Sequence, residues 1–379
     1  MALWWPFRLL VVAVGFLAAA AALAAAPTQI VAPGTALQPV LDAASSGDVI
    51  RLQAGEHAGP VVIRLPLVLE GEQGAAVIGS GEGSVVRVEA PDVTVRGLTI
   101  RGSGDKLDRM DSGIFLDKKA HRALVEGNHL DGNLFGVYVW GPEEAIVRSN
   151  TIRGRRVHIT SETGSGVRIW NSPGSRILDN DIEFGADGIY VHASSRNVFR
   201  GNTMRNVRFA VHYMYTNDSE VSGNRSFDSD VGYAIMFSHR LEVRDNISDG
   251  DRDHGFMFNY ANYSRAEGNI VRNGGEKCVF IYNANFNELR RNWFEGCELG
   301  IHFTAGSEGN TVSGNAFIRN RSQVKYVATR FVDWSKDGQG NYWSDNAAFD
   351  LDGDGIADQP YRPNDVIDQV LWRNPMAMV

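Results

Sequence analysis

Apolar and polar residues alternate in short segments that recur at regular spacing through the middle of the chain. Each segment opens on a small residue, as in Gly136–Trp140, Gly188–His192, Ala210–Met214 and Gly300–Thr304. Alternation with a period of two is typical of a β-strand whose two faces meet different environments. We therefore expect the first and third residues after the small residue to point into a core, and the second and fourth to point outward.

Nine asparagines set the length of the repeat. They are 22 or 23 residues apart except for one interval of 30, which holds an excursion near residues 155–162. The nine are Asn128, Asn150, Asn180, Asn202, Asn224, Asn246, Asn269, Asn292 and Asn315. A unit this short cannot bury its own apolar face, so neighbouring units must stack. The Leu-x-x-Leu-x-Leu frame of a leucine-rich solenoid is absent. The sequence thus predicts an all-β, right-handed parallel β-helix with coils of about 22–23 residues. The asparagines receive a structural part, because Asn tolerates left-handed backbone in a tight turn and can bond to the next coil.

The two ends of the chain differ from the repeat. Arg8 precedes an apolar run from Leu9 to Leu23 that ends in small residues, which predicts an export signal over residues 1–24 and a periplasmic protein. Residues 34–44 carry apolar positions at helical spacing, with Thr35 as the expected N-cap, and predict a short helix that covers the first coil. The β-helix with this cap is expected over residues 25–330.

Residues 331–379 are expected to form a C-terminal capping segment that contains an Asp-rich loop. Its aromatics should close the last coil; they are Trp334, Tyr342, Trp343, Phe349 and Tyr361. In the loop, Asp350, Asp352, Asp354 and Asp358 stand at positions one, three, five and nine, with a Gly at position six. That order suits a calcium loop, but position twelve is not the bidentate Glu of an EF-hand. A calcium-stabilised turn and a solvated Asp/Gly loop both remain open.

Composition supports one elongated domain and argues against nucleic acid. The 379 residues include 41 glycines and only 12 prolines, which suits many tight turns with few breaks. The formal net charge is −8, and no basic run or interleaved basic patch offsets it. A nucleic-acid partner is therefore not expected.

The outward positions carry the candidate chemistry. Two outward rows are expected. The residues two positions after the small residue form one row: Tyr138, Arg168, Tyr190, His212, Met236, Met257, Phe280 and His302. The residues four positions after it form the other: Trp140, Trp170, His192, Met214, Ser238, Asn259, Tyr282 and Thr304. Residues of one row in adjacent coils lie about 4.8 Å apart. We therefore expect His212, Met214, Met236 and Met257 to cluster. Thioether and imidazole together suit copper(I). The alternative is an apolar face covered by another protein or a glycan.

A second alternative is enzymatic. Asp251, Arg252, Asp253 and His254 follow one another, and Tyr213, Tyr215 and Tyr260 are expected beside them. A carboxylate that holds a His, a His or Tyr that abstracts a proton, and an Arg that steadies an anion would serve a polysaccharide lyase or uronate C5-epimerase. Such short clusters also occur as turn residues that satisfy backbone groups.

Cys278 and Cys297 are the only two cysteines. An even count in an exported chain favours a disulfide. In coil register, however, Cys278 occupies the position of the small residue, and Cys297 precedes that position by three residues in the next coil. Three extended residues span about 10 Å, so a bridge requires the turn to fold back. The pairing stays open at this point.

Several stretches resemble the NosD family. They are His212–Asn217, Gly232–Met236, Asp251–Gly255, Glu276–Asn285, Phe294–Cys297, Gly300–Glu308, Gln323–Val327 and Gly340–Asn346. The resemblance implies a periplasmic maturation factor for nitrous oxide reductase, without catalysis of its own, that works with the permease and ATPase subunits of an ABC transporter. It implies copper(I) received from a lipoprotein chaperone and passed to the reductase, with membrane contact only through partner subunits. The expected soft cluster and this resemblance point to the same metal.

Overall fold

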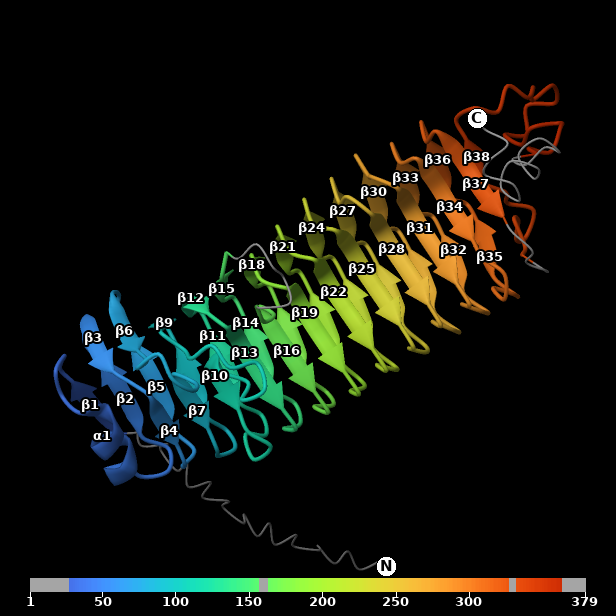
Figure 1. Cartoon of the computed structure of the whole chain (residues 1–379). Coiled ribbons are helices and arrows are strands. Elements are labelled where there is room, and N and C mark those ends of the chain that lie inside the picture. Colours follow the sequence, from blue (N-terminus) through green and yellow to red (C-terminus); the bar gives the residue numbers. More distant parts are fainter. Residues whose placement is uncertain (1–26, 157–162, 327–331, 363–379) are drawn as a thin grey trace, which may run out of the picture.

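The computed structural model describes residues 27–156, 163–326 and 332–362 of the chain. In this part the chain winds into a right-handed β-solenoid of about 13 turns with about 23 residues per coil. Figure 1 shows the strands stacked side by side along one long axis, with helix α1 (Leu37–Ala43) at the N-terminal end. The predicted fold class is confirmed. The predicted export signal, residues 1–24, lies outside the described residues.

Three parallel sheets run the length of the solenoid, and each complete coil contributes one strand to each. Sheet A contains β1 (Thr28–Val31), β2 (Val49–Leu52), β5 (Val68–Gly71), β8 (Thr94–Arg96), β11 (Leu124–Glu126), β14 (Ile146–Arg148), β17 (Arg176–Leu178), β20 (Val198–Arg200), β23 (Glu220–Ser222), β26 (Glu242–Arg244), β29 (Arg265–Glu267), β32 (Glu288–Arg290) and β35 (Thr311–Ser313). Sheet B contains β3 (Gly55–Ala58), β6 (Ala75–Ile78), β9 (Thr99–Arg101), β12 (His129–Asn133), β15 (Thr151–Gly154), β18 (Asp181–Glu183), β21 (Thr203–Arg205), β24 (Arg225–Phe227), β27 (Ile247–Asp249), β30 (Ile270–Arg272), β33 (Trp293–Glu295), β36 (Ala316–Ile318) and β38 (Tyr342–Trp343). Sheet C contains β4 (Val61–Ile63), β7 (Val86–Val88), β10 (Ser112–Leu116), β13 (Phe135–Trp140), β16 (Val167–Trp170), β19 (Asp187–His192), β22 (Phe209–Met214), β25 (Val231–Met236), β28 (His254–Asn259), β31 (Lys277–Tyr282), β34 (Leu299–Phe303) and β37 (Ser322–Tyr326).

The core is a stack of inward side chains in register from coil to coil. One inward row of sheet C joins Ile189, Val211, Tyr233, Phe256, Val279 and Ile301, all of which are buried. Within it the Tyr233 and Phe256 rings stack at 4.6 Å. Because alternate residues of each strand are spent on this packing, the other alternate residues carry any chemistry on the outer face.

The nine asparagines form a buried ladder at the turn between sheets A and B. Each side-chain amide donates to the Oδ1 atom of the Asn in the next coil, from Asn128 through Asn315. Asn341 extends the ladder by one step. The structural part assigned to these residues is confirmed. The left-handed backbone is not at the asparagines, however, but at the residue before each, such as Gly127 and Ser149. The Asn itself points its amide inward along the stack.

Helix α1 (Leu37–Ala43) covers the first coil, as predicted. It buries Leu37 and Leu41, and the Gln38 side chain bonds the backbone of Val62 in β4. The expected N-cap at Thr35 is wrong, because the helix begins one residue later, with Ala36 at the cap position and no side-chain capping bond. In the described part of the chain, no helix is long and apolar enough to span a bilayer.

The C-terminal segment covers the last coil with stacked aromatics. Trp343 packs between Phe317 at 4.5 Å and Tyr361 at 4.6 Å, and Trp334 contacts Phe303 at 5.7 Å. Two other aromatics expected in this cap do not take part: Tyr342 and Phe349 are exposed.

Cys278 and Cys297 form a disulfide, with their Cα atoms 5.7 Å apart. The bridge that the sequence left open exists because residues 296–298 form a turn and not an extension of the strand. Gly296 adopts a positive φ of 75°, and the Cys297 amide donates to Asn320 of the following coil. Cys278 stands at the small-residue position and is in register between Gly255 and Gly300.

Candidate metal centre

The outer face of sheet C carries two rows of side chains, set by the strand register. Row 1 contains Tyr138, Arg168, Tyr190, His212, Ala234, Met257, Phe280 and His302. Row 2 contains Trp140, Trp170, His192, Met214, Met236, Asn259 and Tyr282. Neighbours within a row lie on adjacent strands about 4.8 Å apart.

The expected placement of Met236 beside His212 is wrong. Ala234 is the partner of His212, and Met236 is the partner of Met214. The error comes from two small residues in one coil, Gly232 and Ala234, of which the sequence analysis chose the second as the start of the strand. Gly232 occupies the small-residue position of this coil. A side chain does not fit there, because a Cβ would lie 2.7 Å from an Asp251 carboxylate oxygen.

Row 2 brings three soft ligands together in consecutive coils. His192 of β19 is registered with Met214 of β22, which is registered with Met236 of β25. All three side chains are partly exposed. Burial, with a further contribution from the Arg168 cation, lowers the pKa of His192. The imidazole is therefore neutral near pH 7 and has a lone pair for a metal. One nitrogen and two thioethers form a donor set that suits copper(I) and suits magnesium or calcium poorly.

Met257 lies outside this set but near it. It stands in row 1 between Ala234 and Phe280, one strand beyond Met236 and one row to the side. His212 stands in row 1 on β22, the strand that also carries Met214, and strand β25 separates it from Met257 in the same row. The register therefore divides the four expected copper ligands into the adjacent pair Met214 and Met236 and two separate residues.

His212 is held by a carboxylate and not by the methionines. Its Nδ1 lies 3.1 Å from Asp187 Oδ2, and its ring makes edge contacts of 4.7 Å with Tyr190 and with Phe209. Asp187 is itself paired with Arg208. These contacts orient the imidazole toward the sheet B side of the strand, away from row 2.

A column of exposed and partly exposed aromatics borders row 2; the sequence analysis named Tyr215 and Tyr260 but missed the column that they form with Phe237. Tyr215, Phe237 and Tyr260 each follow a row 2 residue, and their rings stack at 5.1 and 5.0 Å. Tyr215 and Tyr260 are 51% and 42% exposed. All three have positive φ, a strained conformation for bulky residues. Their spacing of 22 and 23 residues was the available signal.

The proposed catalytic alternative is not assembled. Tyr213 points into the core, where its ring contacts Phe199 at 5.2 Å. Asp251 is also buried, and it accepts hydrogen bonds from Ser226, Ser229 and Ser248. His254 lies on the outer face and contacts Phe280 at 5.2 Å. The remaining member, Asp253, directly precedes β28. Its backbone forms hydrogen bonds with the two neighbouring coils. Tyr213 and Asp251 are therefore buried, whereas His254 is partly exposed.

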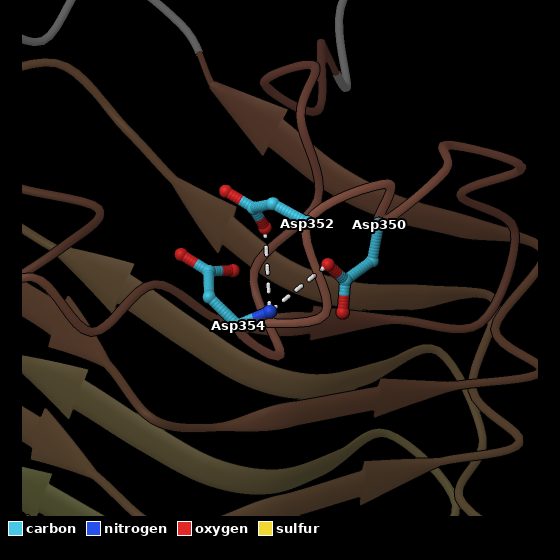
Figure 2. A group of neighbouring side chains, drawn as sticks. All are labelled: Asp350, Asp352 and Asp354. Atoms are coloured by element: carbon cyan, nitrogen blue, oxygen red, sulfur yellow. Dashed lines mark hydrogen bonds between the residues drawn. The ribbon is translucent and has the colours of Figure 1, made fainter.

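The Asp-rich loop gathers three of its four carboxylates. Ligand oxygens of Asp350, Asp352 and Asp354 lie within 4.8 Å of one another, and all three residues are exposed (Figure 2). The Asp354 amide donates to both Asp350 and Asp352. Asp358 takes a different part, since it accepts from the Leu351 amide. The three carboxylates converge as a calcium loop requires, and calcium at this loop stays a prediction.

A family model described as periplasmic copper-binding protein (NosD) matches residues 148–348. Two curated relatives are each named probable ABC transporter binding protein NosD. The protein from Stutzerimonas stutzeri is 41% identical, over 86% of this chain and 78% of its own length. The protein from Pseudomonas aeruginosa is 40% identical, over 86% of this chain and 79% of its own length.

Solved structures with a similar fold include enzymes that act on polysaccharides. A PL6 alginate lyase has a TM-score of 0.60 at 13% identity and covers 83% of this chain and 84% of its own. The A-module of a mannuronan C-5 epimerase from Azotobacter vinelandii has a TM-score of 0.58 at 12% identity, with 81% and 94% covered. At such low identity these matches show a shared fold and nothing about activity.

Proposed function

The chain belongs to the NosD family, and on that premise we propose that it receives copper(I) in the periplasm and passes it on for assembly of the copper centres of nitrous oxide reductase. The proposal assigns it no catalysis of its own. It agrees with the relatives' name of binding protein and with the family description of a periplasmic copper-binding protein.

The observation that carries the proposal is the row His192, Met214 and Met236. Three consecutive coils present one imidazole and two thioethers at the same outward position. Neutral soft donors bind copper(I) without the desolvation cost of burying a carboxylate. Because the three groups are partly exposed on an open face, a bound ion remains within reach of a second protein, as a relay requires.

We assign partner contact to the aromatic column Tyr215, Phe237 and Tyr260 beside the ligand row. The proposed partners are a lipoprotein copper chaperone, the permease and ATPase of an ABC transporter, and the reductase. Exposed Tyr and Phe rings give large contact area at a small cost in side-chain entropy. Their position next to the row would bring a docked partner's own ligands to the ion. Membrane contact is proposed only through the transporter subunits.

The test is an anaerobic copper(I) titration of the mature protein against a chromophoric chelator. Wild-type protein should take up one equivalent, and the variant H192Q/M214L/M236L should lose that uptake. The matched control is M257L, which removes a thioether from row 1 on the same face and should retain binding. Equal binding by wild type and the triple variant would overturn the site. No uptake by wild type would overturn the proposed copper handling.

Docking is tested separately with Y215S/Y260S. This variant should bind copper(I) normally but lose pull-down of the reductase and of the chaperone. Y263S is the control, because Tyr263 is also exposed and stacked, on Phe286 at 5.1 Å, but lies at another turn. Normal complex formation by Y215S/Y260S would remove the column from the proposal.

A further inference from the structure

A polar cavity on the outer face of sheet C is independent of the ligand row. It has a volume of about 400 Å³ and lies over β13, β16, β19 and β22, on the side of the strands that faces sheet B. Row 2 borders the opposite end of these strands. The cavity is within the size range of small-molecule sites in proteins. Five residues that line it carry the argument: Thr163, Arg168, Asp187, Tyr190 and His212.

The first feature is a buried hydrogen-bond acceptor. Asp187 is buried, and its carboxylate accepts hydrogen bonds from the Arg208 guanidinium. His212 Nδ1, 3.1 Å from Asp187 Oδ2, must therefore carry the proton. In the neutral imidazole this fixes the tautomer, with Nε2 as an acceptor. The Nε2 atom is buried and has no partner among the described residues, and the residue as a whole is 8% exposed. A buried polar atom left without a partner is unfavourable, and a ligand group that bonds to it would remove that cost.

The second feature is a buried hydroxyl. Thr163 is 5% exposed, and its Oγ1 has no hydrogen-bond partner within the described part of the chain. It lines the same cavity as His212. A hydroxyl both donates and accepts, so Thr163 can bond either a ligand hydroxyl or a ligand carboxylate.

The third feature is a cation without a counter-charge. The Arg168 guanidinium lies 4.4 Å from the Tyr190 ring centroid and 5.8 Å from that of Tyr138. Among the described residues, the Arg168 guanidinium forms no ion pair. The nearby Asp187 carboxylate already forms an ion pair with Arg208. The cavity thus contains two guanidinium groups and one carboxylate, a net positive site on a chain of formal charge −8. A planar guanidinium held against an aromatic face is oriented for bidentate contact with a carboxylate.

We propose that this cavity binds a small hydroxylated carboxylic acid of the size of a hexuronic acid. The carboxylate pairs with Arg168, and one ligand hydroxyl donates to His212 Nε2. A second polar group of the ligand bonds Thr163 Oγ1, and the apolar face of its ring packs on Tyr190. Each group left without a partner in the cavity is satisfied by one group of such a ligand, whereas inorganic anions supply no hydroxyl donor on a ring and neutral sugars supply no charge.

The test is isothermal titration calorimetry of the copper-free mature protein with glucuronate, glucose, acetate and inorganic phosphate as separate probes. Glucuronate should bind at least roughly tenfold more tightly than the other three, because only it offers both charge and hydroxyls. R168Q should weaken glucuronate binding by a similar factor, and R225Q should not. Arg225 is exposed on sheet B and serves as a matched loss of charge. T163V, which keeps the side-chain shape, gives a second variant that should also weaken binding.

Absence of glucuronate binding by wild type, or equal binding by R168Q and wild type, would overturn the proposal. Equal affinity for acetate, phosphate and glucuronate would overturn the hydroxy-acid assignment and leave a general anion site. The copper titration separates this site from the ligand row. H192Q/M214L/M236L should retain glucuronate binding, and T163V should retain copper(I) binding.

Discussion

Met214 and Met236 are registered partners on the adjacent parallel strands β22 and β25. Their thioethers therefore project from the same face of sheet C at equivalent positions of adjacent coils, although 22 residues separate them in the chain. His192 extends the row by one more coil. A solenoid can gather soft ligands in this way without any local motif, because each coil contributes one residue to each outward row.

The pH dependence of copper binding should reflect the imidazole in this row. The folded-state pKa of His192 is lowered, first by burial and then by the Arg168 cation. Protonation therefore competes with copper only below the ordinary His range. We expect copper(I) affinity to stay constant from pH 8 to about 6.5 and to fall at lower pH. Titrations at several pH values check this. H192Q should abolish the fall, and a decline already complete at pH 6.5 would contradict the assignment.

Substitution within the asparagine ladder should be strongly destabilising. Asn224 accepts from the backbone and side-chain amides of Asn202 and donates to the Phe199 carbonyl and to Asn246. N224A leaves several buried groups without partners and should cost on the order of 3 kcal/mol or more. Urea denaturation followed by far-UV circular dichroism measures the loss. N171D at an exposed turn is the control, because no hydrogen bond of the Asn171 side chain occurs among the described residues and Asp also tolerates its positive φ. A shift no larger than that of the control would refute the ladder's contribution.

Reduction of the disulfide should loosen the C-terminal coils. Cys278 and Cys297 enclose a loop of 19 residues in sequence separation. Cross-linking a loop of this length stabilises by about 3 kcal/mol in the chain-entropy model. The variant C278A/C297A should therefore unfold at lower urea concentration than the oxidised wild type, with little effect on copper(I) uptake. Reduced wild type should match the variant. Identical midpoints for oxidised and reduced protein would show that the bridge does not contribute.

The coil length and the ladder could be predicted from the sequence, because each depends on a spacing that the chain repeats. The N-terminal helix could be predicted from its own apolar spacing. The register of one coil could not. Gly232 and Ala234 are both small, and only the packing of Gly232 against Asp251 in three dimensions selects the first. With Gly232 at the small-residue position, Met236 lies in the row of Met214 and not in the row of His212.

The polar cavity was also beyond the sequence analysis, for a different reason. Asp187 and His212 are 25 residues apart and stand at unlike positions of their coils. Neither residue forms a motif with its neighbours in the chain. Their contact depends on the direction in which the side chains point across the face of sheet C, and the spacing of a row does not give that direction.

The disulfide was left open for a related reason. The distance estimated from the sequence assumed an extended strand, whereas the chain turns at Gly296.

Calcium should stiffen the Asp-rich loop. Asp350, Asp352 and Asp354 place like charges within 4.8 Å of one another, which a divalent cation would neutralise. Because all three are exposed and the position-twelve Glu is absent, we expect a Kd on the order of 10⁻⁴–10⁻³ M. Limited proteolysis within residues 346–362 should slow in millimolar calcium and not in magnesium. The variant D350N/D352N should be cleaved at the same rate with and without calcium. An unchanged wild-type rate would favour the solvated loop.

Asp251 should make the stability of the solenoid depend on pH in an unusual direction. Desolvation by burial raises its folded-state pKa from 3.8 to about 6, although hydrogen bonds from Ser248, Ser229 and Ser226 oppose the rise. Between these two values the folded state binds more protons at this residue than the unfolded state, so the contribution of Asp251 to stability falls as pH rises. The rise corresponds to roughly 3 kcal/mol at about 1.36 kcal/mol per pH unit.

The variant D251N isolates this effect from the rest of the chain. Its amide can accept through Oδ1 from Ser226 and Ser229 and donate through Nδ2 to the Ser248 hydroxyl, but it cannot ionise. We expect D251N to gain stability relative to wild type as pH rises from about 3.8 to above 6, by up to roughly 3 kcal/mol. Urea midpoints of both proteins across this range provide the measurement. Because paired surface carboxylates titrate alike in the two proteins, their contributions cancel in the difference. A difference independent of pH would show that the Asp251 carboxyl has an ordinary pKa and that the serine cluster solvates its charge.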